Sequence, residues 1–329
     1  MNKAYDIMAL GECLVDFVCS ESGGKLHLEG NPGGAPANVL AAAAKLGRST
    51  AMVSKVGADH FGAFLRGHVQ AAGIDTAYLL ADPLHPTTLA IVRLDEAGNR
   101  DFTFYRDRTA DVMLAREDLP LDAICAARVL HFGSLSLTCE PSRAATLAAV
   151  QAAKAAGVTV SYDPNLRPPL WPSLDAARTQ LLAGLALADL VKVSEEELFF
   201  LTGAASLDAG AEALFRRFPL QLLAVTRGPA GCSLYTPTLR CAGATFDTPC
   251  VDTTGAGDAF WGAALAWLLE QERPPQALTP VDLAVLLDFA NAAGSLATTK
   301  RGAIPAMPTR EEIARCIATV PRLTVPDPA

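Results

Sequence analysis

The segment most able to do chemistry is Asp252–Phe260, which reads DTTGAGDAF. It follows a strand-like stretch, Ala244–Val251, and opens an apolar helix predicted over Ala256–Glu270. Glycines at such a junction let successive backbone N–H groups face one point, with the positive end of the helix behind them, and this forms an anion hole for a phosphate. Asp258 lies in the first turn of that helix, where its carboxylate can take a proton from an attacking hydroxyl.

Two familiar phosphate-binding motifs do not fit this segment. Phe260 stands where a dinucleotide-binding fingerprint has its third glycine. The chain contains no Walker A loop. A Gly-x-Gly turn also occurs where a helix simply packs tightly, so these residues by themselves leave a structural role open.

A second Gly-rich segment, Gly30–Asn38, opens an Ala-rich helix predicted over Ala35–Leu46. Its small residues allow a ligand to approach the backbone, and Asn38 offers both a donor and an acceptor to a hydroxyl. Asp16 follows the first expected strand, where α/β proteins place their ligands. A helix cap and a turn former are the plain alternatives for these residues.

Short apolar runs alternate with longer Ala- and Leu-rich runs along the chain. The short runs are apolar on both faces, as buried parallel strands are. Strands separated by helices predict an α/β fold with a parallel sheet and helices on both faces. The expected strands are Tyr5–Leu10, Ala51–Val56, Arg128–Phe132, Val158–Tyr162, Leu190–Val193 and Leu222–Thr226. The expected helices, besides the two above, are His60–Ala72, Pro141–Ala156, Leu174–Ala188, Leu207–Phe218 and Val281–Thr299.

Two segments break this alternation. Cys13–Leu28 and Thr87–Tyr105 contain strand-like runs with no helix between them. In the second segment the runs flank Asp95–Asn99, as in a β-hairpin. Antiparallel strands that emerge from a parallel sheet predict a small appended sheet, which we interpret as a lid.

Composition excludes several classes of protein. Of the 329 residues, 50% are apolar and 19% charged, which indicates a core-forming globular chain. The net charge of −8 argues against a general binder of nucleic acid or of anionic membranes, and the longest apolar stretch, about Ala259–Leu269, is too short to span a bilayer. Eight cysteines without a CxxC pair, and no signal peptide, favour reduced thiols in a cytoplasm. Five scattered histidines argue against a metallohydrolase, and His131 is expected to be a core or rim residue.

Taken in order, the two glycine-rich motifs resemble those of the ribokinase-like (PfkB) family of sugar and nucleoside kinases. DTTGAGDAF resembles its C-terminal signature and GGAPAN, at Gly33–Asn38, its N-terminal one; the resemblance runs from about Asp6 to Pro308. It implies one kinase domain over residues 1–329, with a three-layer α/β fold, a mainly parallel central sheet and a small β-sheet lid. The lid is expected to be formed by about residues 12–32 and 86–108.

The resemblance also implies the site's roles. Asp258 would be the catalytic base, and the backbone of Gly255, Ala256 and Gly257 the anion hole for the transferring phosphoryl group. Asp16 would accept hydrogen bonds from paired sugar hydroxyls. The other sugar contacts carried over are Gly33, Gly34 and Asn38.

ATP, Mg²⁺ and, as a further candidate, K⁺ are the cofactors that the resemblance implies. Glu197 would position Mg²⁺ through water, whereas Ser194 stands where the family usually has Asn. The positions matched to ATP are Lys192, Ser194, Thr226, Arg227, Gly228, Gly231, Gly257 and Asn291. The positions matched to a monovalent cation are Asp252, Thr254, Ala297, Lys300 and Gly302.

Three local features resemble the fructokinase branch: Pro36 in GGAPANV, YDPNLR at residues 162–167 and DFTFYR at residues 101–106. They add Tyr105, Arg106 and Arg167 to the expected substrate-binding residues, and the two arginines could reach the sugar or the transferring phosphate, because arginine recognises such anions well. A salt bridge within the lid is the plain alternative for Arg106, and a surface position is the alternative for Arg167. Fructose is therefore the expected acceptor. Kinases of 2-keto-3-deoxygluconate, of aminoimidazole riboside and of other nucleosides share the scaffold and remain alternatives.

An inactive kinase fold that senses sugar is the alternative from a different class. The intact Asp258 and its glycines argue against it. The expected partners are a small sugar and ATP, together with a second copy of the chain in a homodimer, whereas neither nucleic acid nor a membrane is expected.

Overall fold

The computed structural model describes residues 5–94 and 100–324. Within them a ten-stranded sheet runs in the order β14-β13-β12-β11-β10-β9-β1-β4-β5, and β6 pairs with β4. The strands from β12 to β6 are parallel, whereas β13 and β14 are antiparallel additions at one edge. The strands are β1 Ile7–Leu10, β4 Thr50–Gly57, β5 Ile74–Asp75, β6 Leu79–Asp82, β9 Val129–Gly133, β10 Thr159–Asp163, β11 Leu190–Ser194, β12 Leu222–Thr226, β13 Cys232–Tyr235 and β14 Arg240–Gly243.

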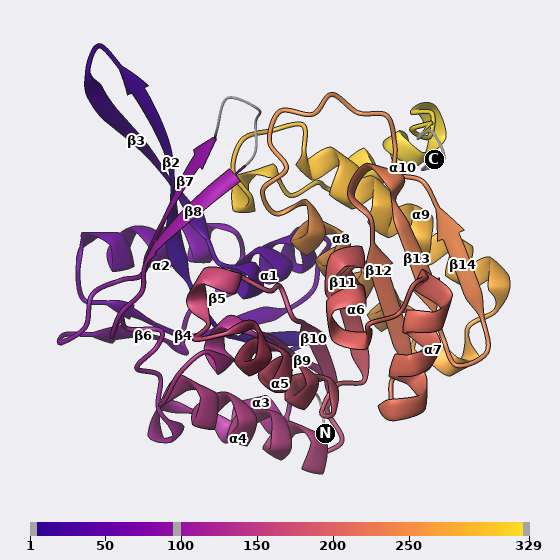
Figure 1. Ribbon diagram of the computed structural model, residues 1–329, viewed down its shortest axis with the longest axis horizontal. Helices are drawn as coiled ribbons and strands as arrows, with labels where there is room; N and C mark the ends of the chain where they lie inside the picture. Colours follow the sequence, from indigo (N-terminus) through magenta and orange to yellow (C-terminus); the bar gives the residue numbers. More distant parts are fainter. Residues whose placement is uncertain (1–4, 95–99, 325–329) are drawn as a thin grey trace.

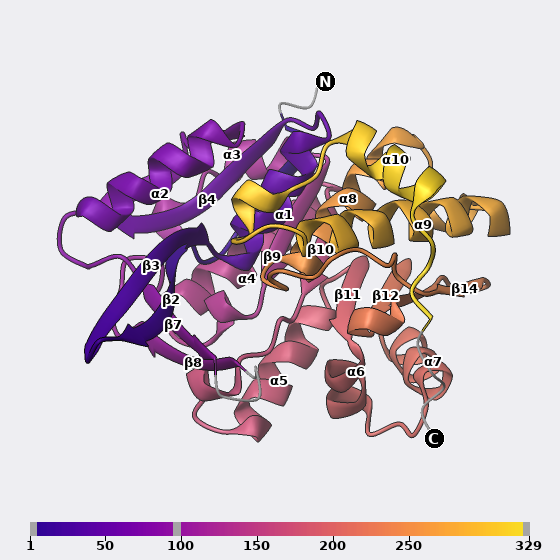
Figure 2. The same ribbon diagram turned by 90° about the horizontal axis from the view of Figure 1, so that it is seen from above.

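Alternation along each strand makes both faces of this sheet apolar. In β1, Ile7 and Ala9 join one buried cluster, and Met8 and Leu10 join the other. The first cluster is covered by α1, α2, α8, α9 and α10, and the second by α3 to α7; Figure 2 shows α8 to α10 on one side of β11 and β12 and α6 and α7 on the other. The helices are α1 Ala35–Lys45, α2 His60–Ala71, α3 Leu121–Cys125, α4 Ser142–Ala155, α5 Leu174–Leu185, α6 Glu195–Thr202, α7 Leu207–Arg217, α8 Ala256–Glu270, α9 Pro280–Ala297 and α10 Arg310–Thr319.

A separate four-stranded sheet has the order β3-β2-β7-β8. Its strands are β2 Leu14–Ser22, β3 Lys25–Gly33, β7 Leu89–Leu94 and β8 Arg100–Tyr105. The β2–β3 hairpin projects from the body of the molecule (Figure 1). The predicted turn at Asp95–Asn99 lies outside the described residues.

The helices α1 and α8 lie unusually close together at Gly262 of α8. A Cβ atom at Gly262 of α8 would lie 2.5 Å from the carbonyl oxygen of Val39 and 2.7 Å from Cβ of Ala42, both in α1. Glycine therefore lets the two helices approach closely. Asn38 and Asp258 lie next to this contact, so it also sets the distance between them.

The expectation of a strand at Ala244–Val251 is wrong. The strand β14 ends at Gly243, and residues 244–255 run irregularly along α9. Their polar groups are satisfied by that helix, since Ser295 Oγ accepts from the amide of Phe246 at 3.1 Å and the carbonyl of Thr298 accepts from Val251 and Asp252. A strand is unnecessary where a helix end supplies these partners.

The helix α9 has the length and composition of a membrane span, and the bent pair α6 and α7 passes the same test together. However, 61% of α9 is buried inside the molecule, where it packs on α8 and α10. Its apolar character is therefore accounted for by the core.

We predict that Gly262→Ala destabilises the protein by about 1–3 kcal/mol, because overpacking outweighs the better helix propensity of alanine. Gly67 of α2 is the matched control, because a Cβ there meets nothing within 4 Å. Gly67→Ala should stabilise by up to about 1 kcal/mol. Urea unfolding measures both, and equal shifts in the same direction would contradict the packing argument.

Candidate active site

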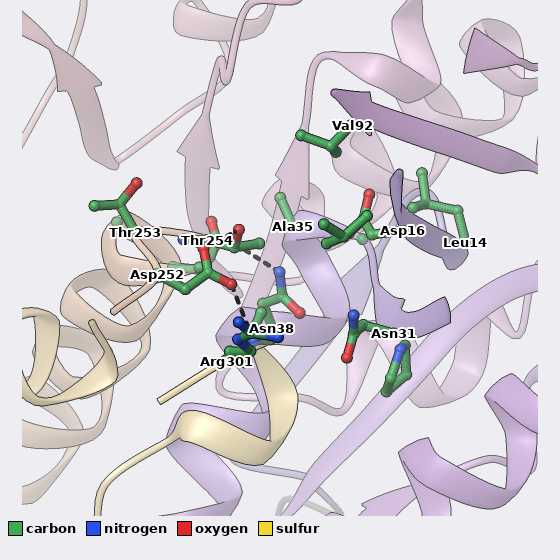
Figure 3. Close-up of a pocket in the computed structure, with 18 of the residues that line it drawn as sticks. Leu14, Asp16, Asn31, Ala35, Asn38, Val92, Asp252, Thr253, Thr254 and Arg301 are labelled. Atoms are coloured by element: carbon green, nitrogen blue, oxygen red, sulfur yellow. Dashed lines mark hydrogen bonds between the residues drawn. The ribbon is translucent and has the colours of Figure 1, made fainter. Parts of the chain in front are cut away.

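A cavity of about 790 Å³ lies where the small sheet faces the carboxyl edge of the main sheet. Asn38 lies between Asp16 and Asn31 on one side and Asp252 and Thr254 on the other (Figure 3). The expected site residues that line the cavity are Asp16, Gly34, Asn38, Arg167, Lys192, Asp252, Thr254, Gly255, Gly257, Asp258 and Gly302. Two motifs more than 200 residues apart thus meet in one cavity.

Asp258 lies in the first turn of α8, which begins after Gly255. Gly255 has φ +75°, and a Cβ there would lie 2.5 Å from that of Ala303, so both its conformation and its packing require glycine. Oδ2 of Asp258 accepts a hydrogen bond from Nδ2 of Asn38 at 2.8 Å. Burial raises the pKa of Asp258 to about 6, although Lys192 lowers it. The carboxylate is therefore a better base than an exposed aspartate.

Lys192 supplies the positive charge beside this carboxylate. A Cβ at Gly257 would lie 3.0 Å from Nζ of Lys192, so the ammonium group lies against the first turn of α8. Nζ also lies 2.8 Å from Oδ2 of Asp163 at the end of the adjacent strand β10. Burial disfavours the charge, but Asp163, Glu197 and Asp258 surround it and raise the pKa of Lys192. The lysine therefore stays protonated.

Asp16 enters the cavity from β2, where it pairs with Asn31 of β3. Gly33 does not line the cavity, but a Cβ there would lie 2.1 Å from Oδ2 of Asp16. Gly33 thus makes room for the Asp16 carboxylate and does not itself face a ligand.

Arg106 and Tyr105 are not brought to the cavity. Arg106 is buried, and its guanidinium donates to Asp111, to Oγ1 of Thr138 and to the carbonyl of Leu135 at 2.8–3.0 Å. Tyr105 is 59% exposed. An internal network thus occupies the Arg106 guanidinium in this structure, as the alternative of a salt bridge expects, and a contact of Arg106 with the substrate stays a prediction. Arg106 directly follows the last residue of β8, and its hydrogen bonds hold this end of the strand against the main body of the molecule.

The positions matched to ATP lie along the neighbouring strand ends. Ser194 and Thr226 are paired at the ends of β11 and β12. Gly231, in the turn after β12, has φ +83°, and a Cβ there would lie 2.0 Å from the carbonyl oxygen of Gly243. Asn291 of α9 donates to that same carbonyl at 3.2 Å. Arg227 and Gly228 lie in the turn between β12 and β13, whereas Lys192 and Gly257 line the cavity.

Both carboxylate oxygens of Glu197 accept hydrogen bonds from backbone amides. Its Oε1 accepts from the amide of Leu166 at 2.6 Å and its Oε2 from that of Ser194 at 2.7 Å. These bonds fix the carboxylate near Asp163 and Lys192, and its expected role of reaching Mg²⁺ through water stays a prediction. Among the described residues, no group of three His, Cys, Asp or Glu side chains is arranged to hold a metal.

The positions matched to a monovalent cation gather around Asp252. Its Oδ1 accepts from the amide and hydroxyl of Thr254, and its Oδ2 from the amide of Gly302 at 3.1 Å. Ala297 ends α9, and Lys300 extends to Glu312 at 3.5 Å. Three donors thus engage the Asp252 carboxylate, and its role toward a monovalent cation stays a prediction.

His131 is a core residue, as the sequence indicated. It is buried, its Nδ1 lies 2.9 Å from Oγ of Ser161, and burial lowers its pKa to about 4. It is therefore neutral and unsuited to be a base.

Sequence reasoning missed Asp163 and Glu12 as parts of the site. Their positions at the carboxyl ends of β10 and β1 are the signal that would have found them.

Comparison with known proteins agrees with this geometry. A profile described as pfkB family carbohydrate kinase matches residues 4–310. Fructokinase-1 of Zea mays is 43% identical over 316 residues, covering 94% of this chain and 97% of that protein, and fructokinase-2 of Solanum lycopersicum is 43% identical over 310 residues, covering 93% and 94%.

Solved structures give the same result. The fructokinase of Xylella fastidiosa with bound ATP has a TM-score of 0.88 and 35% identity, covering 95% of this chain and 98% of that one. The fructokinase of Vibrio cholerae O395 with fructose, ADP and calcium bound has a TM-score of 0.85 and 35% identity, covering 95% and 99%. With the fold, the two motifs and the profile in agreement, this chain belongs to the PfkB family of carbohydrate kinases.

Proposed function

We propose that this chain is an ATP-dependent fructokinase, with Asp258 as its general base. The observation that carries the proposal is the placement of Asp258: buried at the N-terminus of α8, hydrogen-bonded to Asn38 and beside Lys192. The 43% identity to plant fructokinases over more than nine-tenths of the chain supports fructose as the acceptor.

The transfer proceeds as an in-line displacement. Asp258 takes the proton from a sugar hydroxyl, and the hydroxyl oxygen bonds to the γ-phosphorus of ATP as the bond to the β–γ bridging oxygen breaks, leaving ADP. The positive end of α8 and the Lys192 ammonium stabilise the charge on the transferring group. The small sheet closes one side of the cavity and limits the access of water.

The ions enter this scheme as charge partners of the nucleotide. When bound with ATP, Mg²⁺ would neutralise charge on the phosphoryl groups, and Glu197 would hold it through water. A potassium ion beside Asp252 would rest mainly on backbone carbonyls, and it would act by supporting the loop that precedes α8.

The β2–β3 hairpin is the surface that we propose for pairing with a second copy of the chain. Leu26 and Leu28 are 71% and 49% exposed, whereas Leu14 and Val15, nearer the body, are buried. Exposed leucines on a projecting hairpin favour an interface. Sedimentation velocity measures this, and a monomer at micromolar concentration would refute it.

The eight free cysteines agree with a reducing compartment such as the cytoplasm, which cell fractionation tests.

We predict that fructose is the best acceptor in an ADP-release assay with ATP and Mg²⁺. The comparison set is ribose, tagatose, glucose, 2-keto-3-deoxygluconate and aminoimidazole riboside, each with and without K⁺. A preference for the keto acid or the riboside would keep the kinase and reassign the acceptor. No turnover with any acceptor would revive the sugar-sensor alternative.

Asp258→Asn should lower kcat by about 10²–10⁴, because the amide cannot take the proton. The amide oxygen can still accept from Asn38, so sugar KM should change little. Exposed Asp247, in the preceding loop, is the control, and Asp247→Asn should keep wild-type kinetics. Near-wild-type turnover by Asp258→Asn would refute the assignment of the base.

The pH profile of kcat/KM for the sugar should fall on the acidic side with a midpoint near pH 6, because Asp258 acts as a base only when ionised. Lys192 lowers the pKa of Asp258, so Lys192→Met should move that midpoint to higher pH. Lys154, which pairs with Asp189 at 3.1 Å away from the cavity, is the matched control. A midpoint that Lys192→Met leaves in place would contradict the charge coupling.

A further inference from the structure

Glu12 lies in the connection from β1 to β2, between the two sheets, and it is 3% exposed. Its Oε1 accepts a hydrogen bond from the amide of Ala35, the first residue of α1, at 3.0 Å. The carboxyl group lines the cavity, but its Oε2 has no accessible surface and no hydrogen-bond partner among the described residues. Oε2 is thus closed to solvent in this structure, so the role of Glu12 lies in what its Oε1 holds.

The N-terminus of α1 lacks the groups that usually cap a helix. Its N-cap is Gly34, which has no side chain, its second residue is Pro36, which has no N–H, and its first turn contains no acidic residue. Glu12, 23 residues earlier in the chain, provides the acceptor that the local sequence does not.

Two glycines allow the β1–β2 connection to lie close against α1. A Cβ at Gly34 would lie 2.4 Å from the carbonyl oxygen of Glu12, and one at Gly11 would lie 2.7 Å from Cγ of Pro36. These two close contacts hold the connection, and with it the Glu12 carboxyl group, at the N-terminus of α1. The first turn of α1 therefore has a fixed position relative to β1 and β2.

The start of α1 positions a residue of the candidate active site. Asn38 lies three residues after Ala35 and donates to Asp258. Asp16 lies four residues after Glu12, on β2, and faces the same cavity. Glu12 thus stands at the junction of the strand that carries Asp16 and the helix that carries Asn38.

We propose that Glu12 is a positioning residue for the sugar: by capping α1 from the β1–β2 connection, it fixes Asn38 relative to Asp16 and Asp258. The proposal rests on the proposed function of this cavity. Burial raises the pKa of Glu12 to about 7, with Arg106 opposing and Asp111 adding to the effect. A neutral oxygen at the same place can accept the same hydrogen bond from Ala35, so the cap and not the charge should carry the role.

Three variants separate geometry from charge. Glu12→Gln keeps an acceptor at the right length and should keep kcat/KM for fructose within about threefold of the wild type. Glu12→Ala removes the cap and should lower it about tenfold or more, mainly through a higher fructose KM, with ATP KM within about twofold. Glu12→Asp keeps the charge but is one methylene too short, and should resemble Glu12→Ala. If Glu12→Ala does not fold, Gln and Asp still test the proposal, and Asp more active than Gln overturns it.

A double-mutant cycle tests whether Glu12 acts through Asn38. The loss in kcat/KM for Glu12→Ala with Asn38→Ala should be close to that for Asn38→Ala alone, because the cap has nothing left to position. Losses that multiply would overturn the proposal.

Asp282→Ala is the matched control for loss of a helix cap, because Asp282 accepts from the amide of Thr279 at 2.8 Å at the start of α9. It should lower the melting temperature but leave fructose KM unchanged. An unchanged fructose KM in Glu12→Ala, in a wild-type background that phosphorylates fructose, refutes the role of Glu12. A wild type that turns over no sugar refutes the proposed function instead.

Discussion

The close contact between α1 and α8 is the constraint on which the site depends. Gly262 lets the carbonyl of Val39 approach α8 directly, and the hydrogen bond between Asn38 and Asp258 lies next to this contact. A side chain at position 262 would push the helices apart and move the two residues together with their helices. Both helices pack on the same face of the main sheet, and so the packing between them sets a distance in the candidate active site.

The charges at the strand ends form a second constraint. Asp163, Lys192 and Asp258 come from β10, β11 and α8, and each would be costly to bury alone. Together they place one buried positive charge beside two buried carboxyl groups. Burial dominates the raised pKa of Asp258, whereas the neighbouring acids keep Lys192 protonated. One environment thus suits these adjacent groups to the opposite tasks that we propose for them, a base and an electrostatic stabiliser.

Much of the fold and the centre of the site could be predicted from the sequence. The expected bounds of α8 and β12 agree with the structure residue for residue, because glycine, aspartate and apolar runs mark them sharply. The helix α6 was missed since a run of three acids hides its short apolar face, and α9 supplies the partners that make a strand at Ala244–Val251 unnecessary. Arg106 was assigned to the substrate from its type and motif, yet side-chain partners 5 and 32 residues away bind it. The sequence around Arg106 does not reveal which of several hydrogen-bond acceptors its buried guanidinium contacts.

The division of the cavity between two sheets has an evolutionary consequence. Asp16, Asn31 and Val92 belong to the small sheet, whereas Asp258 and Lys192 belong to the main body and its helices. Strands β2, β3 and β7 can therefore accumulate changes that alter acceptor choice while the phosphoryl-transfer machinery is inherited intact. New specificities would arise by drift in a part of the chain that contributes little to the main core. A library confined to those strands would sample acceptors without sampling catalysis.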